Sequence, residues 1–186
     1  MVVLVRGKPV VVHDGDMLLQ RWVGWRAWIV GLVTGDYTHV NIVVRVNGVP
    51  HIAECTPQSW MTEAGAVVPG GVVVRPIGAT LDDARLVKLA VARLDQPLSA
   101  LERDALHRYV HTCAAAPDAS TRYDWGLDFW LAPLSCRTWT STHLTCSEFV
   151  SRAFLAAGRY PRDASLSVTP HQLLMHLRAQ IVQCVF

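Results

Sequence analysis

The sequence predicts an α+β domain built on an antiparallel sheet, and three patterns support this fold class. A hairpin pattern covers residues 38–55, and a buried-helix pattern covers residues 145–158. Apolar strand patterns also occur near both ends of the chain. With 186 residues, the chain is long enough for one domain, residues 1–186, with a sizeable core.

The first element, residues 2–12, has the pattern of a strand with a turn. Its apolar run is interrupted by Arg6, Lys8 and Pro9, which a secretory signal would not contain. We therefore expect an intracellular, cytoplasmic protein or, for a viral source, one that acts in the host cell or the virion.

The next stretch, residues 22–33, is the most apolar in the chain but is too short to span a bilayer. If it is helical, Trp22, Trp25 and Trp28 lie on one side of the helix. A buried helix packed on the sheet is the preferred interpretation. Peripheral membrane contact through the three tryptophans is the alternative.

Residues 38–55 form the hairpin pattern, with Asn47-Gly48 as a two-residue turn. In that register Asn41 faces Glu54, and His39 lies diagonal to Glu54 on the same face. The apolar residues that alternate with them, starting at Val40, would face the core. We expect the helix at residues 145–158 to pack on the face that bears His39 and Glu54.

The remaining elements follow from turn and cap residues. A strand bent at residues 69–71 covers residues 67–75, and an acidic first turn predicts a helix over residues 80–94. A capping box predicts a second helix over residues 99–115. A helix then begins at Thr169-Pro170, and residues 181–186 form a closing strand.

The helix at residues 145–158 begins with a capping box, Thr145 and Glu148, and ends at Gly158. Cys146 therefore lies in its first turn. There, free N–H groups and the helix dipole favour a thiolate. Cys146 is thus a candidate nucleophile, with a small buried hydrophobic residue as the alternative interpretation.

A nucleophilic cysteine needs a base, and the base needs an orienting group. His39 and Glu54 meet these requirements, because one hairpin places them together. Two alternatives stay open. Asp124 could replace Glu54 as the helper carboxylate, and His143 could replace His39, although a loop is a poorer scaffold for a base than a strand.

The chain order His39, Glu54, Cys146 resembles the circularly permuted branch of the NlpC-type papain-like superfamily. That branch includes YiiX/YebB-like bacterial proteins, their poxviral relatives and the lecithin–retinol acyltransferase group. Further matches are residues 15–21, 123–126 and 169–174. The resemblance spans roughly residues 14–176 and favours the YiiX-like group, because the acyltransferases usually carry a second histidine where this chain has Glu54.

The resemblance implies a cysteine hydrolase that cleaves an amide bond through an acyl-cysteine intermediate. Cys146, His39 and Glu54 would be catalytic, while Tyr123, Trp125 and Asn41 would bind a peptide-like or lipid-amide substrate. The alternatives are an acyltransferase or thioesterase acting on lipids at a membrane surface, and a non-catalytic binding module on the same fold.

Charge and cysteine usage limit the partners. A net charge of +2 gives no electrostatic case for nucleic acid. Five cysteines, an odd number without CxxC spacing, argue against a disulfide framework or a structural zinc site. His107 and His111 lie four apart on a predicted helix, but no third ligand is nearby, so we interpret them as a solvated face. We expect neither a metal nor a cofactor.

Overall fold

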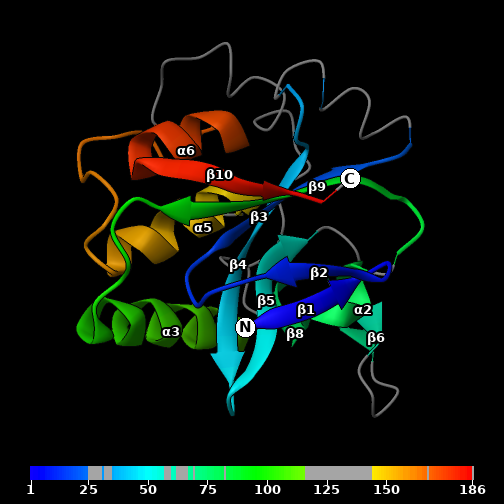
Figure 1. Ribbon diagram of the computed structural model, residues 1–186. Coiled ribbons are helices and arrows are strands. Elements are labelled where there is room, and N and C mark those ends of the chain that lie inside the picture. Colours follow the sequence, from blue (N-terminus) through cyan, green and yellow to red (C-terminus); the bar gives the residue numbers. More distant parts are fainter. Residues whose placement is uncertain are drawn as a thin grey trace.

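The computed structural model describes residues 1–24, 31, 35–56, 60–61, 67–68, 70–81, 83–115, 144–166 and 168–185. Its strands are β1 (Val2–Val5), β2 (Lys8–Val11), β3 (Met17–Trp22), β4 (His39–Val46), β5 (Val49–Thr56), β6 (Trp60–Met61), β7 (Val67–Val68), β8 (Gly71–Pro76), β9 (Leu86–Leu94) and β10 (Ala179–Cys184). Its helices are α2 (Ile77–Leu81), α3 (Ala100–Ala115), α5 (Cys146–Ala156) and α6 (Pro170–Leu177) (Figure 1).

Six of the strands form one sheet in the order β10-β9-β3-β4-β5-β8. Every pair of neighbours in this sheet is antiparallel. Two smaller antiparallel pairs, β1–β2 and β6–β7, lie outside it. The prediction of an α+β fold with an antiparallel sheet is confirmed.

The β4–β5 hairpin has the predicted turn and register. Asn47 and Gly48 both have positive φ angles, 53° and 81°, as a type I′ turn requires. The paired residues run from Val46–Val49 to Ile42–Ala53. This register places His39 and Glu54 on the same face of the sheet.

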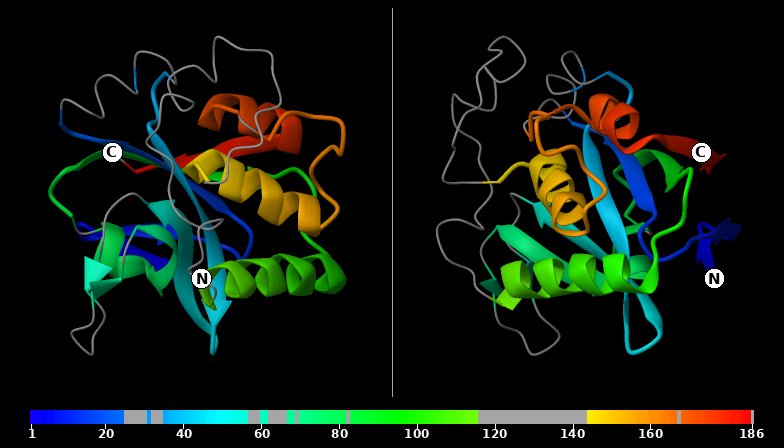
Figure 2. Two further views of the ribbon diagram at one scale, coloured as in Figure 1. Left: turned by 180° about the vertical axis from the view of Figure 1, so that it is seen from behind. Right: turned by 90° about the vertical axis from the view of Figure 1, so that its left-hand side faces the viewer.

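The sheet separates two apolar clusters. Figure 2 shows α5 on one side of the sheet and β1 and β2 on the other. On the face that we call the helix face, β3, β4 and β5 contribute residues that pack against α3, α5 and α6. These strand residues are Met17, Leu19, Val40, Ile42, Val44, Ala53 and Cys55. On the opposite face, the hairpin face, alternate strand residues pack with β1, β2 and α2. They include Leu18, Val43, Ile52, Leu89 and Val91.

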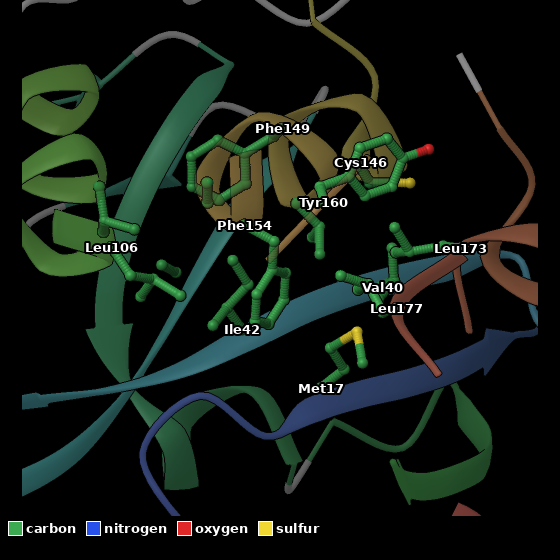
Figure 3. Packing of buried hydrophobic residues seen from close by; sticks show 14 of the residues in the cluster. Met17, Val40, Ile42, Leu106, Cys146, Phe149, Phe154, Tyr160, Leu173 and Leu177 are labelled. Carbon is green, nitrogen blue, oxygen red and sulfur yellow. The ribbon is translucent and has the colours of Figure 1, made fainter. Parts of the chain in front are cut away.

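The helix that carries Cys146 packs on the helix face, so the expectation that it covers the face of His39 and Glu54 is wrong. Figure 3 shows Ile42 of β4 beside Phe154 of α5. His39 and Glu54 are on the hairpin face by register. The physical reason is that the apolar stripe of α5 requires an apolar surface, which the even-numbered residues of β4 provide.

The predicted helix over residues 80–94 is also wrong. The structure has the short helix α2 and then β9, which lies between β3 and β10 in the sheet. Leu89, Ala90, Val91 and Ala92 are fully buried, alternately on the two faces. A strand buried on both faces loses the polar alternation that identifies strands, and its run of leucine and alanine then resembles a buried helix.

The predicted helices over residues 99–115 and 145–158, and the helix that begins at Thr169-Pro170, are confirmed. In α3, the Ser99 and Glu102 side chains each accept a hydrogen bond from the other residue's backbone N–H. Thr169 and Gln172 form the equivalent box at α6. Thr145 caps α5, and Gly158 follows its end with a φ of 72°. The predicted strands at residues 67–75 and at the C-terminal end correspond to β7, β8 and β10.

The tryptophan-rich stretch is described only in part. Trp22 is the last residue of β3 and packs, partly buried, against the core of the hairpin face. Trp25 and Trp28 lie outside the described residues, so the choice between a buried helix and a membrane contact stays open. In the part of the chain that the structure describes, no helix is both long and apolar enough to cross a membrane.

Candidate active site

Cys146 is the first residue of α5 and is 5% exposed. The Thr145 hydroxyl accepts a hydrogen bond from the Glu148 backbone N–H at 3.2 Å. The Glu148 carboxylate in turn forms an ion pair with Arg152, one turn further along, at 2.7 Å. The cap therefore fixes where α5 begins, and the start of the helix places the thiol in the first turn, as the sequence predicts.

His39 and Glu54 form a buried pair on the hairpin face. The Nε2 atom of His39 lies 2.8 Å from Oε2 of Glu54, and the two residues are 9% and 1% exposed. Nη2 of Arg75, on β8, contacts the other carboxylate oxygen, Oε1. Glu54 thus lies between two basic groups from neighbouring strands.

His39 also interacts with Cys146, by charge and by a side-chain hydrogen bond. Because Nε2 is engaged by Glu54, Nδ1 is the ring nitrogen left for the thiol. The backbone N–H groups of Val40 and Ser147 donate hydrogen bonds to the cysteine sulfur as well. The structure therefore brings Cys146, His39 and Glu54 together, although α5 and the His39–Glu54 pair belong to opposite faces.

The end of the β4–β5 ladder explains how the two faces meet. The paired register extends only as far as Ile42–Ala53, whereas β4 begins at His39. In an antiparallel pair, every second backbone N–H points to the neighbouring strand. Val40 lies beyond the last pair, and its N–H donates to the cysteine sulfur instead of to β5.

Electrostatics favour the ion pair of Cys146 and His39. Burial alone would lower the pKa of His39, but the charge of Cys146 and hydrogen bonds to Cys146 and Glu54 outweigh it and raise this pKa to about 10. Burial alone would raise the pKa of Cys146. The charge and hydrogen bond of His39, together with the two backbone N–H groups, outweigh burial, and the pKa falls below the ordinary thiol value.

The same balance acts on Glu54. Burial would raise the pKa of its carboxyl group, but the hydrogen bond and charge of His39, followed by the charge of Arg75, keep it below its ordinary value. The pKa of the nearby Cys55 thiol, on the helix face, shifts in the direction opposite to that of Cys146. Burial and the negative charge of Cys146 raise the pKa of the Cys55 thiol. The surrounding charges thus favour a thiolate at Cys146 and a neutral thiol at Cys55.

The other site residues expected from the sequence are in two groups. Asn41 is fully buried, as is Gln20, the neighbour of His39 on β3, and within the described residues the amides of both have no hydrogen-bond partner. The substrate-binding role of Asn41 stays a prediction. Tyr123 and Trp125 lie outside the described residues, as do the alternative groups Asp124 and His143.

Among the residues that the structure describes, no group of three or more His, Cys, Asp or Glu side chains could hold a metal ion. His107 is half-buried and pairs with Asp14 at 2.9 Å, so it is not part of a solvated face as expected. Asp14 precedes β3, and this contact ties α3 to the start of that strand.

Sequence reasoning missed Arg75 and the Val40 N–H. Arg75 stands opposite Ile52 in the β5–β8 register and is therefore diagonal to Glu54. A lone arginine in an apolar strand pattern, Val72 to Val74, was an available signal. The role of the Val40 N–H depends on where α5 meets the sheet, so no local pattern could have shown it.

Comparisons with known proteins give a fold relationship. No family model and no curated protein matches the chain. Among solved structures, the chain is similar to the metalloprotein yiiX from Escherichia coli O157:H7, described as DUF1105. The two share 18% sequence identity with a TM-score of 0.62, over 94% of this chain and 98% of the other. The chain therefore has a YiiX-like α+β fold.

Proposed function

We propose that this protein is a cysteine-dependent hydrolase that cleaves an amide bond through an acyl-cysteine intermediate. Cys146 is the nucleophile, His39 is the general base and acid, and Glu54 orients the imidazole. In this proposal the fold is papain-like and circularly permuted, because His39 and Glu54 precede Cys146 in the chain.

One observation carries the proposal, namely that a single imidazole interacts with a helix-terminal thiol and with a buried carboxylate. A nucleophile beside a base that a third group orients is the arrangement that such catalysis needs. The lowered pKa of Cys146 and the raised pKa of His39 favour a thiolate and an imidazolium at neutral pH. A binding module on the same fold has no need of this ion pair.

In the first step, the Cys146 thiolate attacks the carbonyl carbon of the substrate amide. The carbon–nitrogen bond then breaks, and the His39 imidazolium gives its proton to the leaving amine. The backbone N–H of Cys146, at the start of α5, stabilises the oxyanion of the tetrahedral intermediate. The products of this step are a thioester on Cys146, a free amine and a neutral His39.

In the second step, water attacks the thioester. His39 accepts a proton from the water as its oxygen bonds to the carbonyl carbon. The carbon–sulfur bond breaks, the acid product leaves, and the thiolate–imidazolium pair is restored. Glu54 keeps Nε2 engaged throughout, which leaves Nδ1 for both proton transfers.

The substrate class rests on the resemblance alone. We propose a peptide-like or lipid amide, with Tyr123 and Trp125 in the binding region. An acyltransferase would use the same intermediate and pass the acyl group to an acceptor other than water. A thioesterase would form the intermediate from a thioester and pass the acyl group to water. The similar Escherichia coli protein is described as a metalloprotein. The described residues of this chain offer no group of three or more His, Cys, Asp or Glu side chains that could hold a metal ion.

The test is the rate of Cys146 alkylation by iodoacetamide as a function of pH, followed residue by residue with peptide mass spectrometry. We expect Cys146 to react with a midpoint well below the free-thiol value of about 8.5. Exposed Cys184 serves as the internal reference. Equal pH profiles for the two thiols would contradict the proposal and favour a binding module.

Adduct trapping then identifies the chemistry. Incubation with cell extract, followed by intact-mass analysis, should leave a peptidyl or amino-acyl adduct on the wild-type protein and none on Cys146→Ala. A fatty-acyl adduct would instead support the lipid alternative. Full turnover of any identified substrate by Cys146→Ala would contradict the assignment of the nucleophile.

A further inference from the structure

Arg75 is a half-buried basic residue whose partner is part of the candidate active site. Its Nη2 atom contacts Oε1 of Glu54, and Oε2 of the same carboxylate binds His39. We infer that Arg75 is a positioning residue, which holds Glu54 ionised and oriented so that the ion pair of His39 and Cys146 can form. This inference rests on the proposed function and extends it beyond the triad.

The guanidinium group of Arg75 is paired with the carboxylate of Glu54. The guanidinium nitrogen Nε is buried and, in the described part of the chain, has no hydrogen-bond partner, so the contact through Nη2 fixes the group. The other nearby carboxylate is Asp83, which lies just before β9. Asp83 already binds Arg85, at 2.7 Å from Nη2 and 3.1 Å from Nε.

The reaction gives a physical reason for a second cation beside Glu54. In the resting state, the thiolate and carboxylate are balanced by the imidazolium and the guanidinium. At the acyl-cysteine stage the sulfur is neutral and His39 has lost its proton, so Arg75 is left as the counter-charge of a carboxylate that is 1% exposed. A buried carboxylate without a cation would take up a proton and cease to accept from His39.

The groups that face this pair are known from each neighbouring element. Around Glu54 and Arg75 they are His39 of β4, Cys55 of β5 and Asp83 before β9. Cys55 in turn faces Cys146 and Glu148 of α5 and Cys113 of α3. Arg75 contributes a positive charge to this set. Without this cation the buried Glu54 carboxylate takes up a proton and no longer supports the imidazolium of His39, so formation of the Cys146 thiolate should require a higher pH.

The experiment is a double-mutant cycle of Arg75→Met and Glu54→Gln, read by the pH midpoint of Cys146 alkylation, with thermal unfolding measured on each protein. We expect Arg75→Met to raise the midpoint by about one pH unit. Arg75→Lys, which keeps the charge, should have an alkylation midpoint close to that of the wild-type protein. In the Glu54→Gln background, Arg75→Met should produce no further upward shift.

The outcomes separate the inference from the proposed function. A wild-type midpoint equal to that of Cys184 would overturn both. A low wild-type midpoint that Arg75→Met leaves unchanged, or that the two substitutions raise additively, would overturn the role of Arg75 and leave the proposed triad in place. If Arg75→Met does not fold, an Arg75→Lys midpoint equal to wild type supports the role of the charge, and a midpoint as high as that of Glu54→Gln overturns it.

Discussion

The two faces of the sheet differ in what they bury. The helix face is apolar, and α5 lies on it with Cys146 at its end. The hairpin face is apolar beside β1 and β2, but at one end it buries polar side chains, those of Gln20, His39, Asn41 and Glu54. The proposed nucleophile and its charge partners therefore come from opposite faces. Stability and reactivity should respond separately to substitutions on the two faces.

The largest effect on stability should come from the helix face. Phe154 of α5 is fully buried beside Ile42. We expect Phe154→Ala to lower the free energy of unfolding by about 3–5 kcal/mol in urea denaturation, because the cavity adds to the lost burial. Val182→Ala, at a position that is 50% exposed, is the control and should change stability by less than about 0.5 kcal/mol. Similar losses in the two variants would show that α5 does not pack as described.

The largest effect on reactivity should come from the hairpin face. His39→Gln removes the cation that lowers the pKa of Cys146. We expect the rate of Cys146 alkylation at pH 6.5 to fall by roughly 10-fold or more, because loss of this cation raises the pKa of the thiol and lowers the thiolate fraction. His107→Gln, on α3, is the control and should alkylate at the wild-type rate. An unchanged rate in His39→Gln would show that this imidazole does not lower the pKa of the Cys146 thiol.

The third prediction concerns the charge interaction between His39 on the hairpin face and Cys146 at the end of α5, and a pH titration tests it. The imidazole of His39 should titrate with a midpoint of about 10, measured by NMR of the ring protons. In Cys146→Ala the midpoint should fall by roughly one unit or more, because the charge of Cys146 helps to raise it. Folding raises this pKa, so the stabilising contribution of His39 is full below the ordinary value of 6.5 and is lost as pH rises through about 10. A midpoint near 6.5 in both proteins would contradict the ion pair.

The smallest effect should come from the cap of α5. Thr145→Ala removes the acceptor for the Glu148 N–H and should lower stability by about 1 kcal/mol. Thr169→Ala removes the matching cap of α6 and should cost a similar amount. Only the first substitution lies beside Cys146, so only Thr145→Ala should slow alkylation. Equal alkylation rates in both variants would show that the start of α5 does not depend on its cap.

Local sequence patterns correctly predicted the features that depend on a few neighbouring residues, namely the hairpin register and the starts of three helices. The Asn47-Gly48 turn determined the hairpin register, and the register placed His39 diagonal to Glu54, as their 2.8 Å contact confirms. Cap residues likewise located the starts of three helices, because a side chain that accepts a backbone N–H acts within one turn. These features follow from backbone conformation and hydrogen bonding over a few residues.

Only the tertiary structure decided features that require distant segments to meet. Residues 86–94 became the strand β9 because β3 and β10 pair with it on both sides, which overrides the helical pattern of its leucines and alanines. The face that α5 covers was decided by the apolar residues of β4, and the contact of Cys146 with Val40 by where the β4–β5 ladder ends. By itself the sequence determined which residues could act as nucleophile, base and orienting group. Their meeting across two faces, and the place of Arg75 behind Glu54, depend on strand order and packing, which no local pattern specifies.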